Sequence, residues 1–322
     1  MRMKIVGLAA AVLASLWAAV SASAQTYPTK TVRIIVPYQA GQGTDVMARY
    51  FAERLTKALG QTFYIDNKPG AGGNIGTEAG ARATPDGYSL TMGTNGTHSM
   101  NEFLYPSTGF DPEKDFAPII LVGMLPMVIA ANPSFAPSSV AELIATAKAK
   151  PDKIDVALPS TTARMVFELL KARSGAPLFG IPYKGSATAL TEVTGGQVQT
   201  LVDTVAAARG QIAAGKLKPL GITTLKPSEL LPGVKTVAEQ GLPDFEVTGW
   251  MALYAPKGTP APVIETLNAE VSKILADPET RTRMLQLGVE PAGGTSQHLA
   301  QFEQRERAKW GPLIKTAGIK GD

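Results

Sequence analysis

The chain has 322 residues, of which 44% are hydrophobic and 18% charged, with a formal net charge of +4 and no cysteine. This composition is typical of a soluble globular protein, and the length is sufficient for two domains. The lack of cysteine excludes disulfides, cysteine nucleophiles and thiolate metal sites. The sequence has no Lys/Arg-rich block, so we expect no nucleic-acid partner.

The first 24 residues have the pattern of a secretory signal peptide. Arg2 and Lys4 precede an apolar run from Ile5 to Val20, and Ala22-Ser23-Ala24 supplies small residues at the usual cleavage position. The alternative is a retained anchor helix, although the run is short for a membrane span and no stop-transfer charges follow it. We expect cleavage after Ala24, which lowers the formal charge to 29 − 27 = +2, and a mature protein in the bacterial periplasm.

From residue 32 onward, apolar β-branched runs alternate with helical patterns, which is typical of parallel strands joined by crossover helices. The expected strands lie at 32–36, 63–67, 88–92, 154–158, 179–183, 198–202 and 219–223. The expected helices begin near residue 46 and lie at 72–83, 140–150, 163–173, 187–194 and 263–275. Two longer extended stretches, at 119–131 and 247–255, suggest that the chain crosses twice between two α/β units. The C-terminal helices would then return to the first unit.

The turn Gly41-Gln42-Gly43-Thr44-Asp45 follows the first strand and looks like a phosphate loop. It is not a dinucleotide fingerprint, because Val46 stands where a third glycine is needed, and the chain has no Gly-Lys-Ser/Thr triplet of a P-loop. Gly41 and Gly43 permit positive φ, and the unpaired amides at a helix start attract a carboxylate as readily as a phosphate. The alternative is a tight strand–helix turn in which Asp45 only caps the helix.

Motifs along the chain carry a resemblance to a known family. They include TVRIIVPYQAGQGTDVMAR, IDNKPGAGGNIGTEAGARATPDGYSL, YKGSATALTEVTGGQVQTLVDTV and GWMALYAPKGTPAPVIETLN. Together with shorter pieces they fall in order over nearly the whole mature chain. The sequence resembles the substrate-binding proteins of the tripartite tricarboxylate transporter family, often called Bug-type receptors.

The resemblance implies an α/β, two-domain periplasmic binding protein-like fold, in which two Rossmann-like lobes are joined by two crossing strands with a ligand cleft between them. It places lobe 1 at 25–125 plus 249–322 and lobe 2 at 126–248. The lobes would close over a small carboxylate, which we expect to be a dicarboxylate, for delivery to two integral-membrane transporter subunits. We expect a monomer with no catalytic residues, no metal and no cofactor.

The resemblance also assigns ligand-binding positions to both lobes. On lobe 1 they are Tyr38, Gln39, Ala40, Gly41, Gln42, Gly43 and Asp45, whose loop offers backbone amides, and Thr94, Asn95, Thr97 and His98 after the third strand. On lobe 2 they are Ser160, Thr161, Thr162, Ala163, Arg164, Tyr183, Lys184 and Asp203. Three of them have alternatives: a loop-ordering hydrogen bond for His98, a turn cap for Asp203 and a solvated position for Lys184.

Arg164 departs from the family pattern, in which a histidine is common at this position, and Val166 and Phe167 replace small residues. The macrodipole mildly disfavours a cation in the first turn of a helix, yet a guanidinium suits bidentate carboxylate recognition. We therefore expect Arg164 to hold a second carboxylate, with terephthalate as the best single candidate. An aliphatic dicarboxylate such as adipate, a tricarboxylate, or a surface arginine without a ligand are the alternatives.

These observations favour a transport receptor over two other functions. For an exported enzyme, two histidines and no cysteine leave few nucleophile constellations, and the chain has no Gly-x-Ser-x-Gly elbow or His-Glu-x-x-His pair. A sensory module that hands a solute to a membrane kinase would have the same sequence features as a transport receptor.

Overall fold

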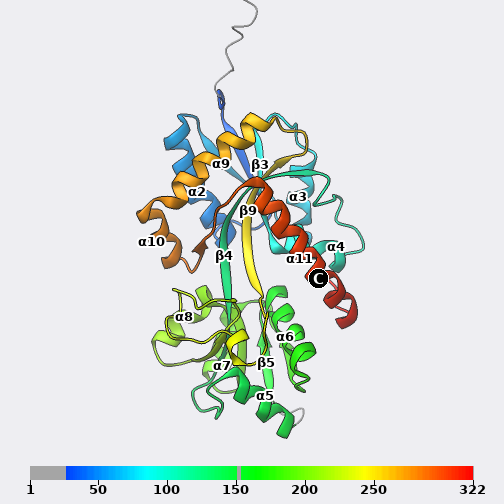
Figure 1. The fold of residues 1–322 in the computed structure, drawn as a ribbon, viewed down its shortest axis with the longest axis vertical. Helices are drawn as coiled ribbons and strands as arrows, with labels where there is room; N and C mark the ends of the chain where they lie inside the picture. Colours follow the sequence, from blue (N-terminus) through cyan, green and yellow to red (C-terminus); the bar gives the residue numbers. More distant parts are fainter. Residues whose placement is uncertain (1–26, 151–153, 322) are drawn as a thin grey trace, which may run out of the picture.

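The computed structural model describes residues 27–150 and 154–321, so the predicted signal peptide lies outside the described residues. Two α/β lobes lie one above the other along the long axis, and strands β4 (Phe116–Ala131) and β9 (Thr248–Pro256) run between them (Figure 1). Lobe 1 denotes the lobe that contains the N-terminal strands, and lobe 2 the other.

The described elements follow the order expected from the sequence. The other strands are β1 Val32–Val36, β2 Phe63–Asn67, β3 Ser89–Thr94, β5 Asp155–Leu158, β6 Phe179–Pro182, β7 Thr200–Thr204, β8 Lys218–Ile222 and β10 Glu290–Pro291. The α-helices are α2 Gly43–Leu59, α3 Asn74–Ala81, α4 Asn101–Leu104, α5 Val140–Ala149, α6 Thr161–Ser174, α7 Ser186–Thr194, α8 Val205–Ala213, α9 Ala261–Ala276, α10 Pro278–Gln286 and α11 Ser296–Ala317. Short helical segments are η1 Ala71–Gly73, the π-helical η2 Gly96–Met100 and η3 Ala238–Gln240.

The sheet of lobe 1 has the strand order β2-β1-β3-β9-β4. β1 pairs in parallel with β2 and β3, whereas β9 pairs antiparallel with both β3 and β4, so the sheet is mixed rather than wholly parallel. Val32, Ile34 and Val36 on one face of β1 and Ile35 on the other are fully buried, as in a strand that is covered on both faces. Val32, Ile34 and Val36 share a core cluster with Met47 and Phe51 of α2.

The sheet of lobe 2 is also mixed. β5 pairs in parallel with β6 and β7, and the second half of β4 pairs antiparallel with β7 and β8. β4 therefore belongs to both sheets: it pairs with β9 as far as Pro126 and with β7 from Met127. The interruption that the sequence shows at Leu125-Pro126 is not the end of a strand but the place where one strand changes partners.

The carboxyl ends of the parallel strands point to the waist in both lobes. In lobe 2, Thr204 at the end of β7 pairs with Met127, next to the change of partners in β4. In lobe 1, Thr94 at the end of β3 pairs with Met251, near the start of β9. Ligands of open α/β sheets bind outside the carboxyl ends of the strands, so this topology positions a site between the lobes.

The C-terminal helices do not all stay on lobe 1. α9 lies against β4 and α2, and α10 lies against β10, whereas α11 runs down the molecule and also contacts α6 of lobe 2 (Figure 1). Trp310 and Ile314 of α11 share one core cluster with Val166 and Phe167 of α6. The lobes are thus connected by packing as well as by two strands.

Candidate ligand cleft

Three helix N-termini lie at the carboxyl edges that face the waist. α2 follows β1, α6 follows β5 and α7 follows β6. Gln42 before α2 and Gly185 before α7 make no side-chain capping hydrogen bond. The first amides of a helix lack intrahelical partners and carry positive partial charge, so the uncapped starts of α2 and α7 are suited to an anion.

The loop between β1 and α2 has one glycine with positive φ, whereas the sequence led us to expect two. Gly41 has φ 85°, in the left-handed region, whereas Gly43 is the first residue of α2 and lies outside that region. The expectation of positive φ at Gly43 is wrong, because the helix begins earlier than the hydrophobic periodicity indicates. Gln39, Ala40, Gly41, Gln42 and Gly43 are all exposed. The Gly41 amide donates to Asp45 and the Gln42 amide donates to the Gln39 carbonyl, so the amides of Gln39, Ala40 and Gly43 are the ones open to a ligand.

Asp45 is buried and organises this loop from inside. Its Oδ2 accepts hydrogen bonds from the Gly41 amide at 2.8 Å and from Arg49 Nε at 3.0 Å, and its Oδ1 accepts from Asn67 Nδ2 at 2.9 Å. Burial opposes ionisation, but the hydrogen bonds from Arg49, Gly41 and Asn67 outweigh it and lower the pKa of Asp45. An ionised, fully bonded carboxylate repels a ligand anion, so Asp45 positions the loop rather than contacting the ligand.

Tyr38 joins this loop to the one that follows β3. Its hydroxyl lies 2.7 Å from Thr94 Oγ1, and its backbone carbonyl accepts from Asn67 Nδ2 at 3.0 Å. Thr97 Oγ1 accepts from the Thr94 amide at 3.0 Å. The side chains of Tyr38, Thr94 and Thr97 are therefore engaged in holding the two loops together.

His98 lies in the core of lobe 1 and not on the cleft. It is fully buried, its ring stacks on Tyr254 with centroids 3.9 Å apart, and its Nδ1 is 2.9 Å from Thr97 Oγ1. Burial, together with the nearby Arg307, lowers the pKa of His98 to about 3, so the ring is neutral. The assignment of His98 to the ligand does not agree with this position, whereas the alternative, a loop-ordering hydrogen bond, does.

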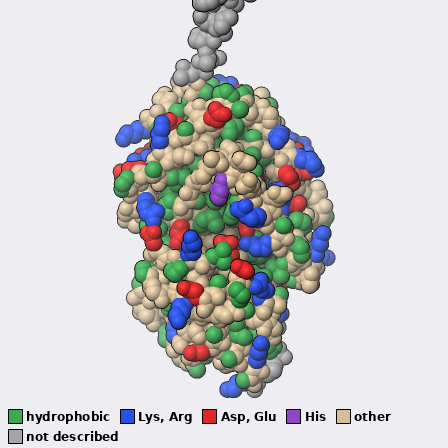
Figure 2. All heavy atoms as spheres, in the orientation of Figure 1, with side chains coloured by type: hydrophobic (Ala, Val, Ile, Leu, Met, Phe, Trp, Pro, Cys, Tyr) green, Lys and Arg blue, Asp and Glu red, His purple; other side chains and the backbone are tan. Residues whose placement is uncertain are grey.

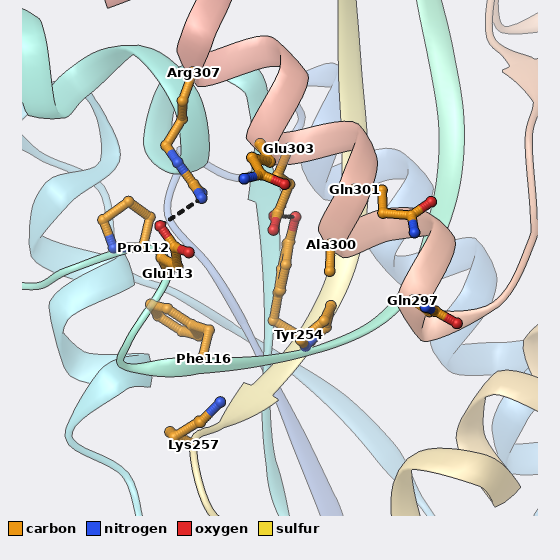
Figure 3. A pocket seen from close by; sticks show the side chains of 12 residues that line it. Pro112, Glu113, Phe116, Tyr254, Lys257, Gln297, Ala300, Gln301, Glu303 and Arg307 are labelled. Carbon is orange, nitrogen blue, oxygen red and sulfur yellow. Dashed lines mark hydrogen bonds and ion pairs between the residues drawn. The ribbon is translucent and has the colours of Figure 1, made fainter.

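A small cavity of about 270 Å³ lies on the other side of Tyr254, between α11 and the loop before β4. Figure 3 shows the Tyr254 hydroxyl directed at Glu303, and Arg307 directed at Glu113, whose Oε2 is 2.9 Å from Arg307 Nη2. None of the ligand-binding positions assigned from the sequence lines this cavity.

On the side of lobe 2, the first turn of α6 forms the wall of the candidate cleft. Ser160 is the N-cap of α6, and its Oγ accepts a hydrogen bond from the Ala163 amide at 3.1 Å, so the Ser160 hydroxyl is partly engaged. Ala163 itself is buried. Thr162 Oγ1 accepts from Asn95 Nδ2 of lobe 1 at 3.1 Å. The structure thus brings one predicted residue of each lobe into direct contact.

The α6 cavity, a space of about 640 Å³, lies between α6 and the edge strand β6. Of the predicted residues, its lining includes Ser160, Thr161, Arg164, Tyr183 and Lys184, and none from the 38–45 loop. The side chains of Arg164 and Lys184 form no hydrogen bond or ion pair within residues 27–150 and 154–321, and both are exposed. Tyr183 donates to Glu192; burial and this acceptor raise the pKa of Tyr183 to about 12.

Sequence reasoning missed most of the other residues of the α6 cavity, among them Lys171, Phe179, Ile319 and Lys320. Phe179 is 59% exposed, which is unusual for a large apolar side chain, and Lys171 Nζ lies 5.1 Å from the centroid of the Phe167 ring. A basic, aromatic lining could not be read from sequence spacing, since the residues come from α6, β6 and the far end of the chain. Figure 2 shows charged side chains of both signs along the waist of the molecule.

Asp203 ends β7 and is buried. Its Oδ1 accepts from the Thr204 amide at 2.7 Å, and its Oδ2 has no hydrogen-bond partner in the described part of the chain. Burial raises the pKa of Asp203, and the nearby Ser186 side chain and the Thr204 amide act in the opposite direction. Thr204, not Asp203, caps α8, because its Oγ1 accepts from the Ala207 amide.

Comparison with known proteins identifies the family. The family model of the tripartite tricarboxylate transporter family receptor matches residues 47–319. The chain belongs to this receptor family. No helix of the described residues is both long enough and apolar enough to cross a membrane.

One relative and two solved structures are similar to this receptor over most of the chain. The protein BugT of Bordetella pertussis is 35% identical over 301 residues, which cover 92% of either chain. The structure of Rpa4515 from R. palustris with adipate is 35% identical, with a TM-score of 0.78 over 91% of this chain and 99% of that one. MatC from Rhodopseudomonas palustris with bound malate is 33% identical, with a TM-score of 0.74 over 89% of this chain and 100% of that one.

Proposed function

We propose that this receptor captures a small carboxylate in the periplasm and delivers it to a membrane transporter of the tripartite tricarboxylate type. The observation that carries the proposal is that α2, α6 and α7 begin after β1, β5 and β6, at the carboxyl edges that face the waist. Such starts stabilise carboxylates through backbone amides and the helix dipole.

The ligand site that we propose has two walls. On lobe 1, the amides of Gln39, Ala40 and Gly43 receive one carboxylate, while Tyr38, Asp45, Thr94 and Thr97 hold the loop in shape. On lobe 2, the first turn of α6 and the loop with Tyr183 and Lys184 face the ligand from the other side. Asn95 and Thr162 connect the walls, and Asp203 supplies a buried acceptor for a ligand hydroxyl or a water.

The ligand that we propose is a dicarboxylate. Arg164 offers a guanidinium without a partner in a cavity of about 640 Å³. Burying an unpaired cation on closure would be costly, so a second ligand carboxylate is its natural partner. The solved relatives with adipate and malate bind diacids. The apolar and aromatic lining from Phe167, Phe179 and Tyr183 favours a flat aromatic diacid, and terephthalate is our specific candidate.

We further propose that the mature protein is a monomer and that its partners are two integral-membrane subunits. Closure of the lobes about β4 and β9 would present a different surface to these subunits when a ligand is bound.

A thermal-shift screen of the mature protein, residues 25–322, tests the proposal. Bound ligand stabilises the folded state by mass action, so diacids should raise the unfolding temperature in a concentration-dependent way. The panel should contain terephthalate, adipate, malate and citrate, with benzoate and an uncharged diamide of terephthalate as controls. A stabilisation by the diamide equal to that by the diacid would refute carboxylate recognition.

A further inference from the structure

The C-terminal segment that follows α11 forms one wall of the α6 cavity. Ile319 and Lys320 line the cavity together with Arg164 of α6. Ile319 is only 4% exposed and belongs to the core cluster that contains Phe167 and Leu170. The other walls of the cavity come from lobe 2, so a segment near the C-terminus completes the cavity.

Contacts with lobe 1 determine where this segment lies. Gly318 ends α11 in the left-handed region with φ 62°, and the Ile319 amide donates to the Ile314 carbonyl at 3.1 Å. The Gly321 amide donates to the carbonyl of Leu104 in α4 at 2.9 Å. A Cβ at Gly321 would lie 2.4 Å from the ring of Tyr105, so the segment packs closely on lobe 1. Lys320 therefore belongs to a segment that packs on lobe 1, and it lines a cavity of lobe 2.

Among the described residues, the charges in the α6 cavity are unbalanced. Its lining includes one carboxylate, that of Glu168, and four cations, those of Arg164, Lys171, Lys184 and Lys320. Within the described ranges Lys320 is exposed and has no hydrogen bond or ion pair. Cations that share a cavity repel one another, and an anion placed between them removes this repulsion.

We propose that Lys320 is a specificity-determining residue of the receptor, which together with Arg164 holds the second carboxylate of a dicarboxylate ligand. The inference rests on the proposed function and extends it, because one carboxylate then contacts a cation of each lobe. A ligand with a second anionic group bridges the two lobes directly, whereas a monocarboxylate leaves Arg164 and Lys320 in one cavity without a ligand anion. The receptor therefore binds diacids more tightly than monoacids.

Calorimetry of the mature protein with terephthalate and with benzoate tests this role. Lys320→Gln should weaken terephthalate binding about tenfold and leave benzoate binding unchanged, since only the diacid has a group for the removed cation. The dissociation constant for terephthalate should also depend less on salt in Lys320→Gln, because one charge contact is absent. Lys320 is exposed, so the unfolding temperature of the ligand-free variant should equal that of the wild type.

Lys315→Gln is the matched control. Lys315 lies on α11 a turn earlier and its Nζ is 5.9 Å from the centroid of the Phe103 ring, away from the lining of the α6 cavity. Binding by Lys320→Gln that equals the wild type, or an equal loss in both lysine variants, would overturn the inference. If Arg164→Ala still weakens terephthalate in that case, the proposed function stands and only the role of Lys320 falls. A wild type that binds no diacid overturns both.

Discussion

Asn95 of lobe 1 and Thr162 of lobe 2 are joined by a hydrogen bond across the waist, with Nδ2 donating to Oγ1 at 3.1 Å. Asn95 lies just after β3 and is nearly buried, and Thr162 lies in the first turn of α6. The bond therefore connects the two carboxyl edges between which we place the ligand. Under the proposed closure of the lobes, its strength contributes to the balance between their open and closed arrangements.

Thr162→Val removes this acceptor and keeps the shape of the side chain. We expect a loss of about 0.5–1.5 kcal/mol in the contact between the lobes, the usual net contribution of one hydrogen bond. If the lobes move as rigid bodies about β4 and β9, the ligand-free variant should have a larger radius of gyration than the wild type by small-angle scattering. With saturating ligand the two should agree. One radius of gyration for all four samples would argue against such closure.

Gly41 and Gly43 should differ in their tolerance to substitution. Gly41→Val places a β-branched residue at φ 85°, which costs about 1–2 kcal/mol and displaces the amides that receive the carboxylate. Gly43→Ala should bind like the wild type, because Gly43 is helical and a Cβ there meets nothing within 4 Å. Calorimetry with the best ligand of the screen decides this. Full affinity in Gly41→Val would mean that the loop does not contact the ligand.

Glu303 should make stability depend on pH. Burial raises the pKa of Glu303 to about 8, from an ordinary 4.5 in the unfolded chain. The folded state therefore keeps a proton that the unfolded state has lost, so this contribution is complete below pH 4.5 and disappears as the pH rises to about 8. The slope is at most about 1.4 kcal/mol per pH unit. Glu303→Gln retains a neutral acceptor for Tyr254 and removes the slope.

Urea unfolding of the wild type and Glu303→Gln between about pH 5 and 8 measures this effect. The difference in free energy of unfolding, wild type minus variant, should fall as the pH rises. A difference that is constant over this range would show that Glu303 is ionised in the folded protein.

The exported protein should begin at Gln25. The basic start, the apolar run and Ala22-Ser23-Ala24 predict cleavage there. Intact mass spectrometry of the protein released from the periplasm measures the N-terminus directly. A mass that still includes residues 1–24 would instead support a retained anchor.

Much of the fold could be predicted from the sequence. The apolar, β-branched segment 32–36 coincides with β1, because buried parallel strands have a strong local pattern. The segment 63–67 coincides with the edge strand β2, of which only Phe63 is buried. Element boundaries were less certain: α2 begins at Gly43, three residues before the first apolar position of its periodic pattern. α8 was missed altogether, since its small side chains give little periodicity.

The candidate site was less predictable than the fold. Arg164 could be placed in the first turn of α6 from the helical pattern, whereas Ser160, the N-cap, was assigned only through the family resemblance. The burial of His98 could not, because it depends on the stacking of its ring on Tyr254, more than 150 residues further along the chain. Lys320 was missed for the same reason: only the course of α11 across both lobes brings it to α6.

The central claim is that Arg164 receives a second ligand carboxylate. The most direct measurement is the calorimetric affinity of the wild type and Arg164→Ala for terephthalate and for benzoate. Removal of one partner of a buried charge pair costs about 2–5 kcal/mol, so Arg164→Ala should weaken terephthalate by that amount and leave benzoate nearly unchanged. Unchanged terephthalate affinity in Arg164→Ala, or equal affinity of the wild type for the diacid and the monoacid, would contradict the account.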